Sequence, residues 1–378
     1  MSPLSRRRTG PGVDLDSVHA ALAGVEDPEL GLSLPEAGMV GAVELGRGGA
    51  VHVTVRLTTP TCPMKERLVA DVTEAVGRVP GVARVEVGLA AMSDGERLRL
   101  AGRLRGARPE GTHPFGDGSS TRVYAVASGK GGVGKSSLTA NLAVALAQQG
   151  QRVGVLDADV WGYSIPQLFG VRRAPVALKG VMLPVEAHGV ALMSVGFFVD
   201  DEEPVVWRGP MLHKAIEQFL ADVHWGRLDT LLLDLPPGTG DVTMSLLELL
   251  PDAQLLAVTT PQLAAQTVAA RVGRMARDAR MPVAGVVENM STLVCPACAH
   301  ETPLFGEGGG ARLADAISAP LLGRVPLDLP LRTAGDVGVP AMVATPTAPS
   351  ATEIRRIAGE LPVVRRSLVG RALPLSVV

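Results

Sequence analysis

The fold of this chain is decided by the stretch Gly129-Lys130-Gly131-Gly132-Val133-Gly134-Lys135-Ser136. It follows an apolar run, Val123–Ala127, and precedes a helical pattern, Leu138–Gln149. Glycines at these spacings let backbone N–H groups turn inward around phosphate groups, and the start of the next helix adds a positive partial charge. The order of strand, glycine-rich loop and helix therefore predicts a loop that binds a nucleoside triphosphate.

The side chains of this loop predict specific contacts with the nucleotide. We expect Lys135 to reach the β- and γ-phosphates and the Ser136 hydroxyl to bind Mg²⁺. Lys130 is an additional lysine inside the loop, which taken alone could be a solvated charge. The predicted nucleotide-binding residues of the segment are Gly129, Lys130, Gly131, Gly132, Val133, Gly134, Lys135, Ser136 and Ser137.

Two further apolar runs end in aspartates. Asp157 and Asp159 follow the first run, and Asp234 follows the second. Because open α/β sheets bind ligands at the carboxyl ends of their strands, we expect these side chains to lie beside the phosphates. We assign Asp234 to Mg²⁺, Asp159 to the attacking water and Asp157 to support of the site. An aspartate at a strand end can also simply cap a helix, but two such runs after a phosphate loop favour the functional interpretation.

Short apolar runs alternate with helical patterns from residue 122 onward. This alternation predicts an α/β fold in which a mostly parallel sheet is flanked by helices. The expected helices besides Leu138–Gln149 are Leu212–Val223 and Ala264–Arg277. The expected strands are Val123–Ala127, Val153–Leu156, Ala191–Val195, Leu231–Leu233, Leu255–Val258 and Val283–Val287.

The first part of the chain predicts a separate, small α+β domain over residues 1–100. Apolar residues alternate with polar ones from Val51 to Leu57, which is typical of a half-buried strand, and Val40–Leu45 can pair with it. An amphipathic helix is expected from Leu68 to Val79, and Val82–Val87 returns as a strand. Residues 101–121 are rich in Gly, Arg, Pro and Ser and predict a linker that covers no core. The phosphate-loop domain then spans residues 122–378.

Composition narrows the class of protein further. The 378 residues are 46% hydrophobic and 20% charged, with a net charge of −2. We therefore expect no nucleic-acid partner, and the absence of a long apolar run predicts no membrane span. The three arginines at 6–8 are interpreted as a solvated tail. Only three cysteines are present, which argues against a disulfide framework and favours a cytoplasmic protein.

Two of these cysteines form the single C-x-x-C motif, Cys295 and Cys298. Three interpretations are open from the residues alone. The pair could form a redox disulfide, or it could join nearby ligands such as His300 in a zinc site. Alternatively, two chains could each contribute a pair to one shared metal cluster at a two-fold axis.

Together, these stretches resemble the Mrp/ApbC family of iron–sulfur cluster carrier ATPases, part of the MinD-like class with deviant, two-lysine phosphate loops. The first 100 residues look like the small iron–sulfur assembly domain often fused in front of such ATPases; their matching stretches include Asp27-Pro28-Glu29 and Thr58-Thr59-Pro60-Thr61-Cys62-Pro63. The other matching stretches are SGKGGVGKSS (128–137), LDADVWGYSIP (156–166), WRGPM (207–211), LLDLPPGTGD (232–241), TTPQ (259–262), ENMS (288–291) and CPACAHETPLFG (295–306).

The resemblance implies a function and a set of roles. Cys295 and Cys298 from two subunits would hold a bridging 4Fe–4S cluster in a homodimer that hydrolyses ATP slowly and hands the cluster to apoproteins. Lys130 would contact phosphates across the dimer interface, and Asn289 would hydrogen-bond the adenine edge. One departure is Tyr163, which stands where many members have Pro.

Two other classes of function compete with the carrier. A positioning ATPase of the MinD or ParA kind, acting on membrane or DNA, fits the phosphate loop and Lys130 equally well, yet such proteins usually carry an amphipathic helix or a basic patch. A two-electron redox protein would use Cys295 and Cys298 but would leave the nucleotide site without a purpose. Cys62, next to a predicted helix start, is a further hypothesis as a participant in cluster transfer.

Overall fold

A computed structural model gives the structure of the chain, which divides into two compact units. The N-terminal unit comprises Met1–Arg108 with Val176–Pro184, and the phosphate-loop unit comprises Pro109–Pro175 with Val185–Val378. The predicted arginine tail and the stretch after Pro362 lie outside the described residues. The described residues are 13–59, 62, 64–106, 112–116, 118–199, 209–238, 240–278, 281–295, 297–298 and 300–362.

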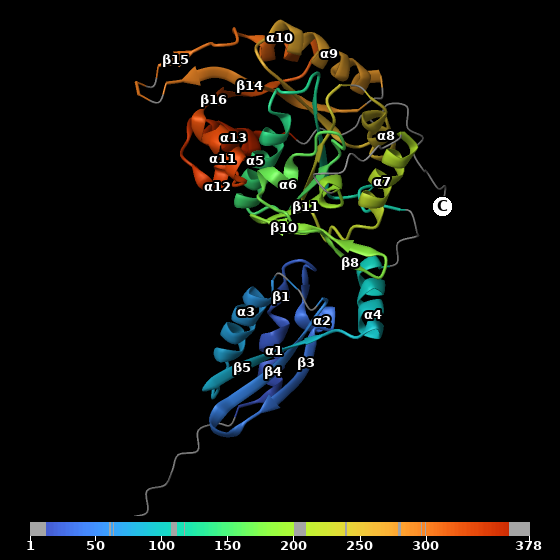
Figure 1. Cartoon of the computed structure of the whole chain (residues 1–378), viewed down its shortest axis with the longest axis vertical. Coiled ribbons are helices and arrows are strands. Elements are labelled where there is room, and N and C mark those ends of the chain that lie inside the picture. The colour runs from blue at the N-terminus through green and yellow to red at the C-terminus, as the bar shows by residue number, and fades with distance from the viewer. Residues whose placement is uncertain are drawn as a thin grey trace, which may run out of the picture. The chain divides into compact units, whose positions relative to one another are not determined.

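The N-terminal unit is an α+β fold, as predicted (Figure 1). Its sheet has the order β3-β4-β5, with β3 antiparallel and β5 parallel to the central strand. Alternate residues of β4 are buried, so the period of two did mark a half-buried strand. The remaining helices and strands of this part are short or flank the sheet. The bounds are α1 Leu15–Ala23, β1 Glu26–Asp27, β2 Leu32–Ser33, α2 Leu34–Ala37, β3 Val40–Leu45, β4 Ala50–Leu57, α3 Lys65–Gly77 and β5 Arg84–Ala91.

One helix of this unit replaces the start of the predicted linker. Helix α4 spans Asp94–Arg105 and begins with a capping box in which Ser93 and Glu96 bond each other's backbone N–H. It buries Leu100, Ala101 and Leu104 in the apolar core of the unit. The prediction that residues 101–121 cover no core is therefore wrong, because the charged residues of this helix obscure the spacing of its few apolar ones.

A hairpin from later in the chain completes the N-terminal unit. Strands β8, Val176–Leu178, and β9, Val181–Leu183, are antiparallel and join at Lys179-Gly180, where both residues have positive φ. The apolar side chains of the hairpin lie in the same buried cluster as Leu100 and Leu104 of α4. Its tip is also held by polar contacts, since the Arg105 guanidinium donates to the Gly180 carbonyl at 3.1 Å. This hairpin was not among the strands predicted from the sequence.

The end of the predicted linker packs within the phosphate-loop unit. Phe115 is buried, and its ring meets Trp225 edge-on at 6.2 Å. The Thr121 hydroxyl donates to the Leu228 carbonyl at 2.9 Å. The aromatic and hydroxyl contacts are long-range in sequence, so the Gly- and Pro-rich composition around them could not reveal them.

A mixed, mostly parallel sheet forms the centre of the phosphate-loop unit and confirms the predicted fold class. In the described residues its order is β10-β11-β7-β12-β6-β13-β14-β15, and β16 pairs with β14. The strands β10 and β15 run antiparallel to their neighbours, and the other pairs are parallel. The bounds are β6 Arg122–Ser128, β7 Val153–Asp157, β10 Val185–Ala187, β11 Val190–Ser194, β12 Thr230–Asp234, β13 Gln254–Thr259, β14 Val283–Val294, β15 Glu301–Thr302 and β16 Leu321–Leu327.

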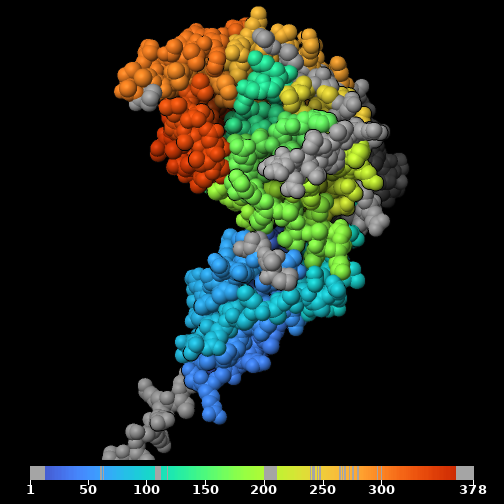
Figure 2. Space-filling view, in the orientation of Figure 1, coloured from blue at the N-terminus to red at the C-terminus, as the bar shows by residue number. Residues whose placement is uncertain are grey.

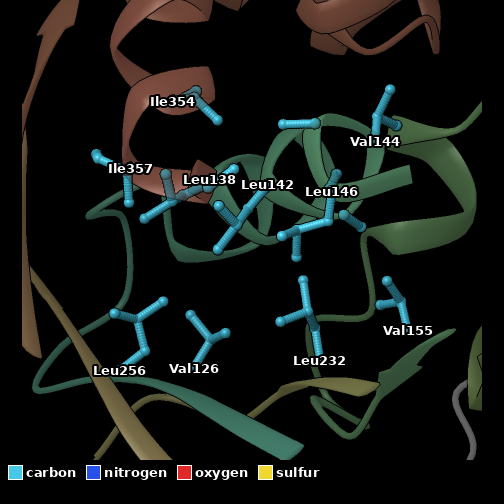
Figure 3. Close-up of a cluster of buried hydrophobic side chains, with 14 of the residues drawn as sticks. Val126, Leu138, Leu142, Val144, Leu146, Val155, Leu232, Leu256, Ile354 and Ile357 are labelled. Carbon is cyan, nitrogen blue, oxygen red and sulfur yellow. The ribbon is translucent and has the colours of Figure 1, made fainter. Parts of the chain in front are cut away.

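Helices cover both faces of this sheet, and Figure 3 shows the packing on one of them. There α5 and α13 lie over the strands, so that Leu142 and Ile354 meet Val126, Leu232 and Leu256. The remaining helices of this unit connect strands or close its ends. The bounds are α5 Lys135–Gln148, α6 Ile165–Leu168, α7 Gly209–Ala221, α8 Asp241–Leu249, α9 Leu263–Asp278, α10 Gly309–Ile317, α11 Leu329–Val337, α12 Ala341–Ala344 and α13 Pro349–Glu360.

The opposite face is covered by α9 and α10. Ala257 points to that face because its strand neighbours Leu256 and Val258 point to α5. With Val286 it packs against Ile317 of α10. Figure 2 shows the orange segment that carries β14–β16 beside the red segment of the last helices. Among the described residues, every helix is too short or too polar to span a bilayer.

Candidate functional site

The phosphate loop connects β6 to α5 at the carboxyl end of the sheet. Gly132 and Gly134 have φ of 80° and 78°, a conformation that side chains other than glycine rarely adopt. The loop encloses a pocket of about 250 Å³. Its lining brings together most of the predicted loop residues with Asp159: Ser128, Lys130, Gly131, Gly132, Val133, Gly134, Lys135, Ser136, Ser137, Asp159, Gly162, Ser164 and Pro237.

Asn289 stabilises the phosphate loop through a hydrogen bond to its backbone. It lies in β14 and is buried, and its Nδ2 donates to the Val133 carbonyl at 2.8 Å. A Cβ atom at Gly134 would lie 2.2 Å from the same nitrogen, so only glycine fits there. The structure therefore places Asn289 against the loop backbone, a contact that the sequence did not predict.

Lys135, Ser136 and Asp234 form one polar cluster at the start of α5. The Lys135 ammonium lies 2.7 Å from Asp234 Oδ1, and the Ser136 hydroxyl donates to Asp234 Oδ2 at 2.5 Å. Thr139, one turn further along α5, donates to Oδ1 at 2.9 Å. Asp234 has no exposed surface, so these donors balance a buried carboxylate. Thr139 was missed, although it lies four residues after Lys135 and hence on the same helix face.

The two other aspartates differ in their surroundings. Asp157 accepts hydrogen bonds from the Ser194 hydroxyl at 3.0 Å and from the Ile165 N–H at 3.3 Å. Burial, together with the nearby charge of Asp234, raises the pKa of Asp157 to about 7. These contacts tie β7 to β11 and to the start of α6.

Asp159 faces the phosphate pocket. Its Oδ2 lies 4.0 Å from the Lys135 ammonium, and its Oδ1 accepts from the Gly162 N–H at 3.1 Å. Burial raises the pKa of Asp159 above the ordinary value, while the charge of Lys135 opposes the rise. The side chain is thus held in place at the phosphate end of the site and keeps one oxygen near the lysine.

A second pocket of about 300 Å³ adjoins the first. The two share Gly134, Ser137 and Ser164, and the second contains more apolar surface. Asn289 and Met290 form one side of it, while Pro326 and Leu327 from the end of β16 form another. A polar cradle for phosphates and a more apolar chamber therefore lie side by side, which is the arrangement that a nucleotide requires.

Lys130 is held within its own chain. Its ammonium donates to the amide oxygen of Gln262 at 2.8 Å, and the Ser128 hydroxyl donates to its carbonyl oxygen at 3.1 Å. Gln262 directly precedes α9, at the end of the strand next to β6. Gln262, from the stretch 259–262 that resembles the family, therefore contacts the phosphate loop directly.

The cysteine pair lies outside the phosphate pocket. Strand β14 continues seven residues beyond its predicted end at Val287 and pairs with β15, so Cys295 and Cys298 lie in the connection of a two-stranded ribbon (Figure 1). The Cys295 N–H donates to the His300 carbonyl at 3.0 Å. Cys298 is exposed and Cys295 is half-buried, so both thiols are accessible.

Backbone hydrogen bonds favour the thiolate form of Cys295. Hydrogen bonds from the backbone N–H groups of Ala297 and Cys298 lower the pKa of Cys295, and the thiolate is the form that binds metals. In the part of the chain that the structure describes, no group of three or more His, Cys, Asp and Glu side chains is placed to hold a metal ion. Cys62, in contrast, is buried in the N-terminal core.

The fold and the phosphate site together define a P-loop NTPase. A family model described as NUBPL iron-transfer P-loop NTPase matches residues 119–362, and one described as iron–sulfur cluster assembly protein matches residues 15–87. The chain belongs to this iron-transfer P-loop NTPase family, as the resemblance of its motifs predicted.

Relatives along nearly the whole chain support the same assignment. An iron–sulfur cluster carrier protein of Mycobacterium tuberculosis is 49% identical over 95% of this chain and 96% of its own length. One from Synechocystis is 42% identical over 92% and 96%. A solved nucleotide-binding protein of Archaeoglobus fulgidus in complex with ADP is 35% identical, with a TM-score of 0.54, over 65% of this chain and 94% of that one.

Proposed function

We propose that this protein binds ATP with Mg²⁺, hydrolyses it slowly, and carries a 4Fe–4S cluster between two copies of the chain for delivery to apoproteins. One observation carries the proposal: strand β14 holds both Asn289, which supports the phosphate loop, and the ribbon that presents the cysteines. Cys295 lies six positions after Asn289, which corresponds to at most roughly 20 Å along the strand. Nucleotide site and cysteine site are thus joined by a single element.

The two adjoining pockets support the binding of ATP. The loop N–H groups and Lys135 receive the phosphates, while the base enters the more apolar chamber beside Asn289 and Met290. The ADP in the solved relative from Archaeoglobus fulgidus supports this choice of ligand. In this arrangement Asn289 has two tasks, support of the loop and contact with the adenine edge.

The donor set of Ser136 and Asp234 fits Mg²⁺. A hydroxyl and a carboxylate oxygen lie 2.5 Å apart, and Mg²⁺ usually takes one or two protein oxygens together with water and phosphate oxygens. The ion supplies charge that stabilises the phosphates in the transition state. Within the chain, Lys135 shifts from Asp234 to phosphate oxygens, and Asp159 orients the water that attacks the γ-phosphate.

The cluster cargo requires two chains. A 4Fe–4S cluster is held by four thiolates, and the ribbon offers two, Cys295 and Cys298. The lowered pKa of Cys295 favours the thiolate. Two ribbons meeting at a two-fold axis would supply the full set, so the proposed form is a homodimer. A positioning ATPase would share the phosphate loop but would give this cysteine ribbon no task.

Anaerobic reconstitution tests the proposal most directly. Iron and sulfide are measured in the wild type, in Cys295→Ser and in Cys62→Ser, and the mass of each protein is determined by light scattering with and without ATP. We expect about four irons per dimer in the wild type and in Cys62→Ser, and a loss of iron in Cys295→Ser. Transfer to an apo-ferredoxin should slow in Lys135→Ala. A colourless, monomeric wild type would refute the carrier function.

A further inference from the structure

The hydrogen bond between Lys130 and Gln262 is not explained by the carrier function and points to a further role for Gln262. Lys130 lines the phosphate pocket, yet its ammonium is bonded to an amide of the same chain. The two residues belong to neighbouring strand ends, because Ser128 at the end of β6 is paired with Val258 of β13. Sheet pairing therefore brings both backbones close together, and the side-chain bond joins the phosphate loop to the residue before α9.

Gln262 is a well-anchored partner for this lysine. Pro261 before it restricts the backbone, and the carbonyl of Gln262 accepts the Ala265 N–H at 3.0 Å as α9 begins. Its side chain therefore starts from a fixed point and its amide oxygen is directed at Lys130. The bond is partly buried, so water competes with it less than at an open surface.

We propose that Gln262 is a positioning residue that holds Lys130 in its own subunit and so opposes the ATP-dependent joining of two subunits. The inference rests on the proposed function, and on the role that the family resemblance implies for Lys130, contact with phosphates in a second copy of the chain. Lys130 must leave Gln262 before it can reach across, so the bond stabilises the separate subunit. Association then requires ATP, whose phosphates offer the ammonium a stronger, charged acceptor than a neutral amide.

Two substitutions of Gln262 act in opposite directions. Gln262→Met keeps the length of the side chain but has no amide acceptor, so Lys130 is released. Gln262→Glu keeps the shape but pairs Lys130 with a carboxylate, so the hold strengthens. Because a hydrogen bond to a charged group stabilises the state that contains it, and solvent exposure weakens the effect here, we expect the dimer dissociation constant in ATP to fall about 3- to 10-fold in Gln262→Met and to rise by a similar factor in Gln262→Glu.

The reactivity of Lys130 in the nucleotide-free protein gives a second readout. The chain has five lysines, so brief labelling with acetic anhydride and mass spectrometry can follow each one. Labelling of Lys130 should increase in Gln262→Met and decrease in Gln262→Glu. The exposed Lys214 serves as the internal control and should not change. A merely structural role of Gln262 would move both lysines or neither.

The outcomes separate this proposal from the proposed function. Equal dimer dissociation constants in the wild type and both variants would overturn the role of Gln262 and leave the shared cluster intact. A weaker dimer in Gln262→Met would likewise overturn it, since Gln262 would then hold Lys130 in a productive position. A failure of all three proteins to associate in ATP would overturn the dimer and the role of Gln262 together. The expected pair of opposite shifts, with matching changes in Lys130 labelling, supports the proposal.

Discussion

Gly134 shows how a single residue joins the nucleotide site to the strand that leads to the cysteines. Its φ is positive, and its hydrogen atoms face the Asn289 amide, where a Cβ would lie 2.2 Å away. Substitution to alanine must displace Asn289 or the loop. Backbone strain of this kind costs about 1–3 kcal/mol, so Gly134→Ala should weaken ATP binding by about 5- to 150-fold, as measured by calorimetry with MgCl₂.

A matched substitution separates this effect from a general loss of stability. Gly77 ends α3 with open space around its Cα, so Gly77→Ala adds the same methyl group without a clash. Both proteins should melt as cooperatively as the wild type, and only Gly134→Ala should lose ATP affinity. Normal affinity in Gly134→Ala would mean that the loop adapts and that Asn289 does not restrain it.

The raised pKa of Asp157 predicts how the free energy of unfolding depends on pH. Its pKa is raised from 3.8 to about 7, mainly by burial. Between about pH 4 and 7 the unfolded chain releases this proton before the folded one, so Asp157 lowers the free energy of unfolding as pH rises through this window. Asp157→Asn removes that contribution. The difference in unfolding free energy, variant minus wild type, should therefore increase from pH 4 to 7, by less than ~1.4 kcal/mol per pH unit.

Urea unfolding of both proteins at pH 4.5, 6 and 7.5 measures this difference. The constant cost of replacing a carboxylate that accepts from Ser194 and Ile165 cancels, because only the change with pH is compared. A flat difference across the three pH values would show that Asp157 is ionised in the folded protein throughout. Above pH 7 both states are ionised and the difference should no longer change.

At the residue scale, the sequence predicted which groups meet but not how they bond one another. The phosphate loop and the strand-end aspartates were placed together because motif order and sheet geometry determine their positions. The bonds from Thr139 to Asp234 and from Lys130 to Gln262 depend on side-chain rotamers and on residues more than 90 positions apart. Helical spacing alone could have placed Thr139 on the face of Lys135, but no local pattern identifies the distant partner of either bond.

Among the elements, strand β14 was predicted only in part, although in the proposed function it joins the nucleotide site to the cysteines. Its apolar run ends at Val287, where polar residues begin, and the predicted strand was therefore ended there. The strand continues because its backbone pairs with β16 and β15, which are distant in sequence. Strand β16 was not predicted, because Gly323 and Pro326 interrupt its apolar pattern. The central strands, in contrast, are buried on both faces and therefore read as continuous apolar runs.

The position of the hairpin β8–β9 in the N-terminal core predicts the effect of substitutions in it. Leu178 is fully buried in the core of the N-terminal unit, while its neighbour Ala177 is exposed. A carboxylate at the buried position would lie among the apolar side chains of this cluster and would lose its water. Leu178→Asp should therefore lower the melting temperature of the N-terminal unit by several degrees, whereas Ala177→Asp should leave it within about a degree.

Limited proteolysis locates the effect of this substitution. Cleavage within residues 13–106 should accelerate in Leu178→Asp and stay slow in Ala177→Asp, since opening of the N-terminal core exposes its strands. Unchanged cleavage in Leu178→Asp would mean that the hairpin is dispensable for this core. The result also bears on domain boundaries, because a fragment ending near residue 108 would lack the hairpin side chains that pack with Leu100 and Leu104.

Across the whole molecule, the chain passes between the two units at more places than the predicted linker alone. The segment between Asp159 and Ser194 leaves the phosphate-loop unit, contributes β8 and β9 to the N-terminal unit, and returns at β10. Both ends of this excursion touch Asp157, through Ile165 and Ser194. Allosteric coupling needs an element that both sites influence, and this segment joins the carboxylates of the nucleotide site to the N-terminal core along the chain.

The proposed homodimer yields a prediction that only the assembled molecule can test. A pair of one wild-type chain and one Cys295→Ser/Cys298→Ser chain has two ribbon thiolates in place of four, too few for a 4Fe–4S cluster. Such mixed pairs, isolated through two different affinity tags and reconstituted anaerobically, should contain almost no iron and should lack the brown colour.

The matched control is a mixed pair in which one chain carries Cys62→Ser. Cys62 lies in the core of the N-terminal unit, away from solvent, so this pair should bind as much iron as the wild type. Iron retained by the ribbon-deficient pair would indicate ligands outside the two ribbons. Iron at half the wild-type content would instead indicate one site per chain, because then each intact ribbon would bind metal without its partner, and the two-fold arrangement would be wrong.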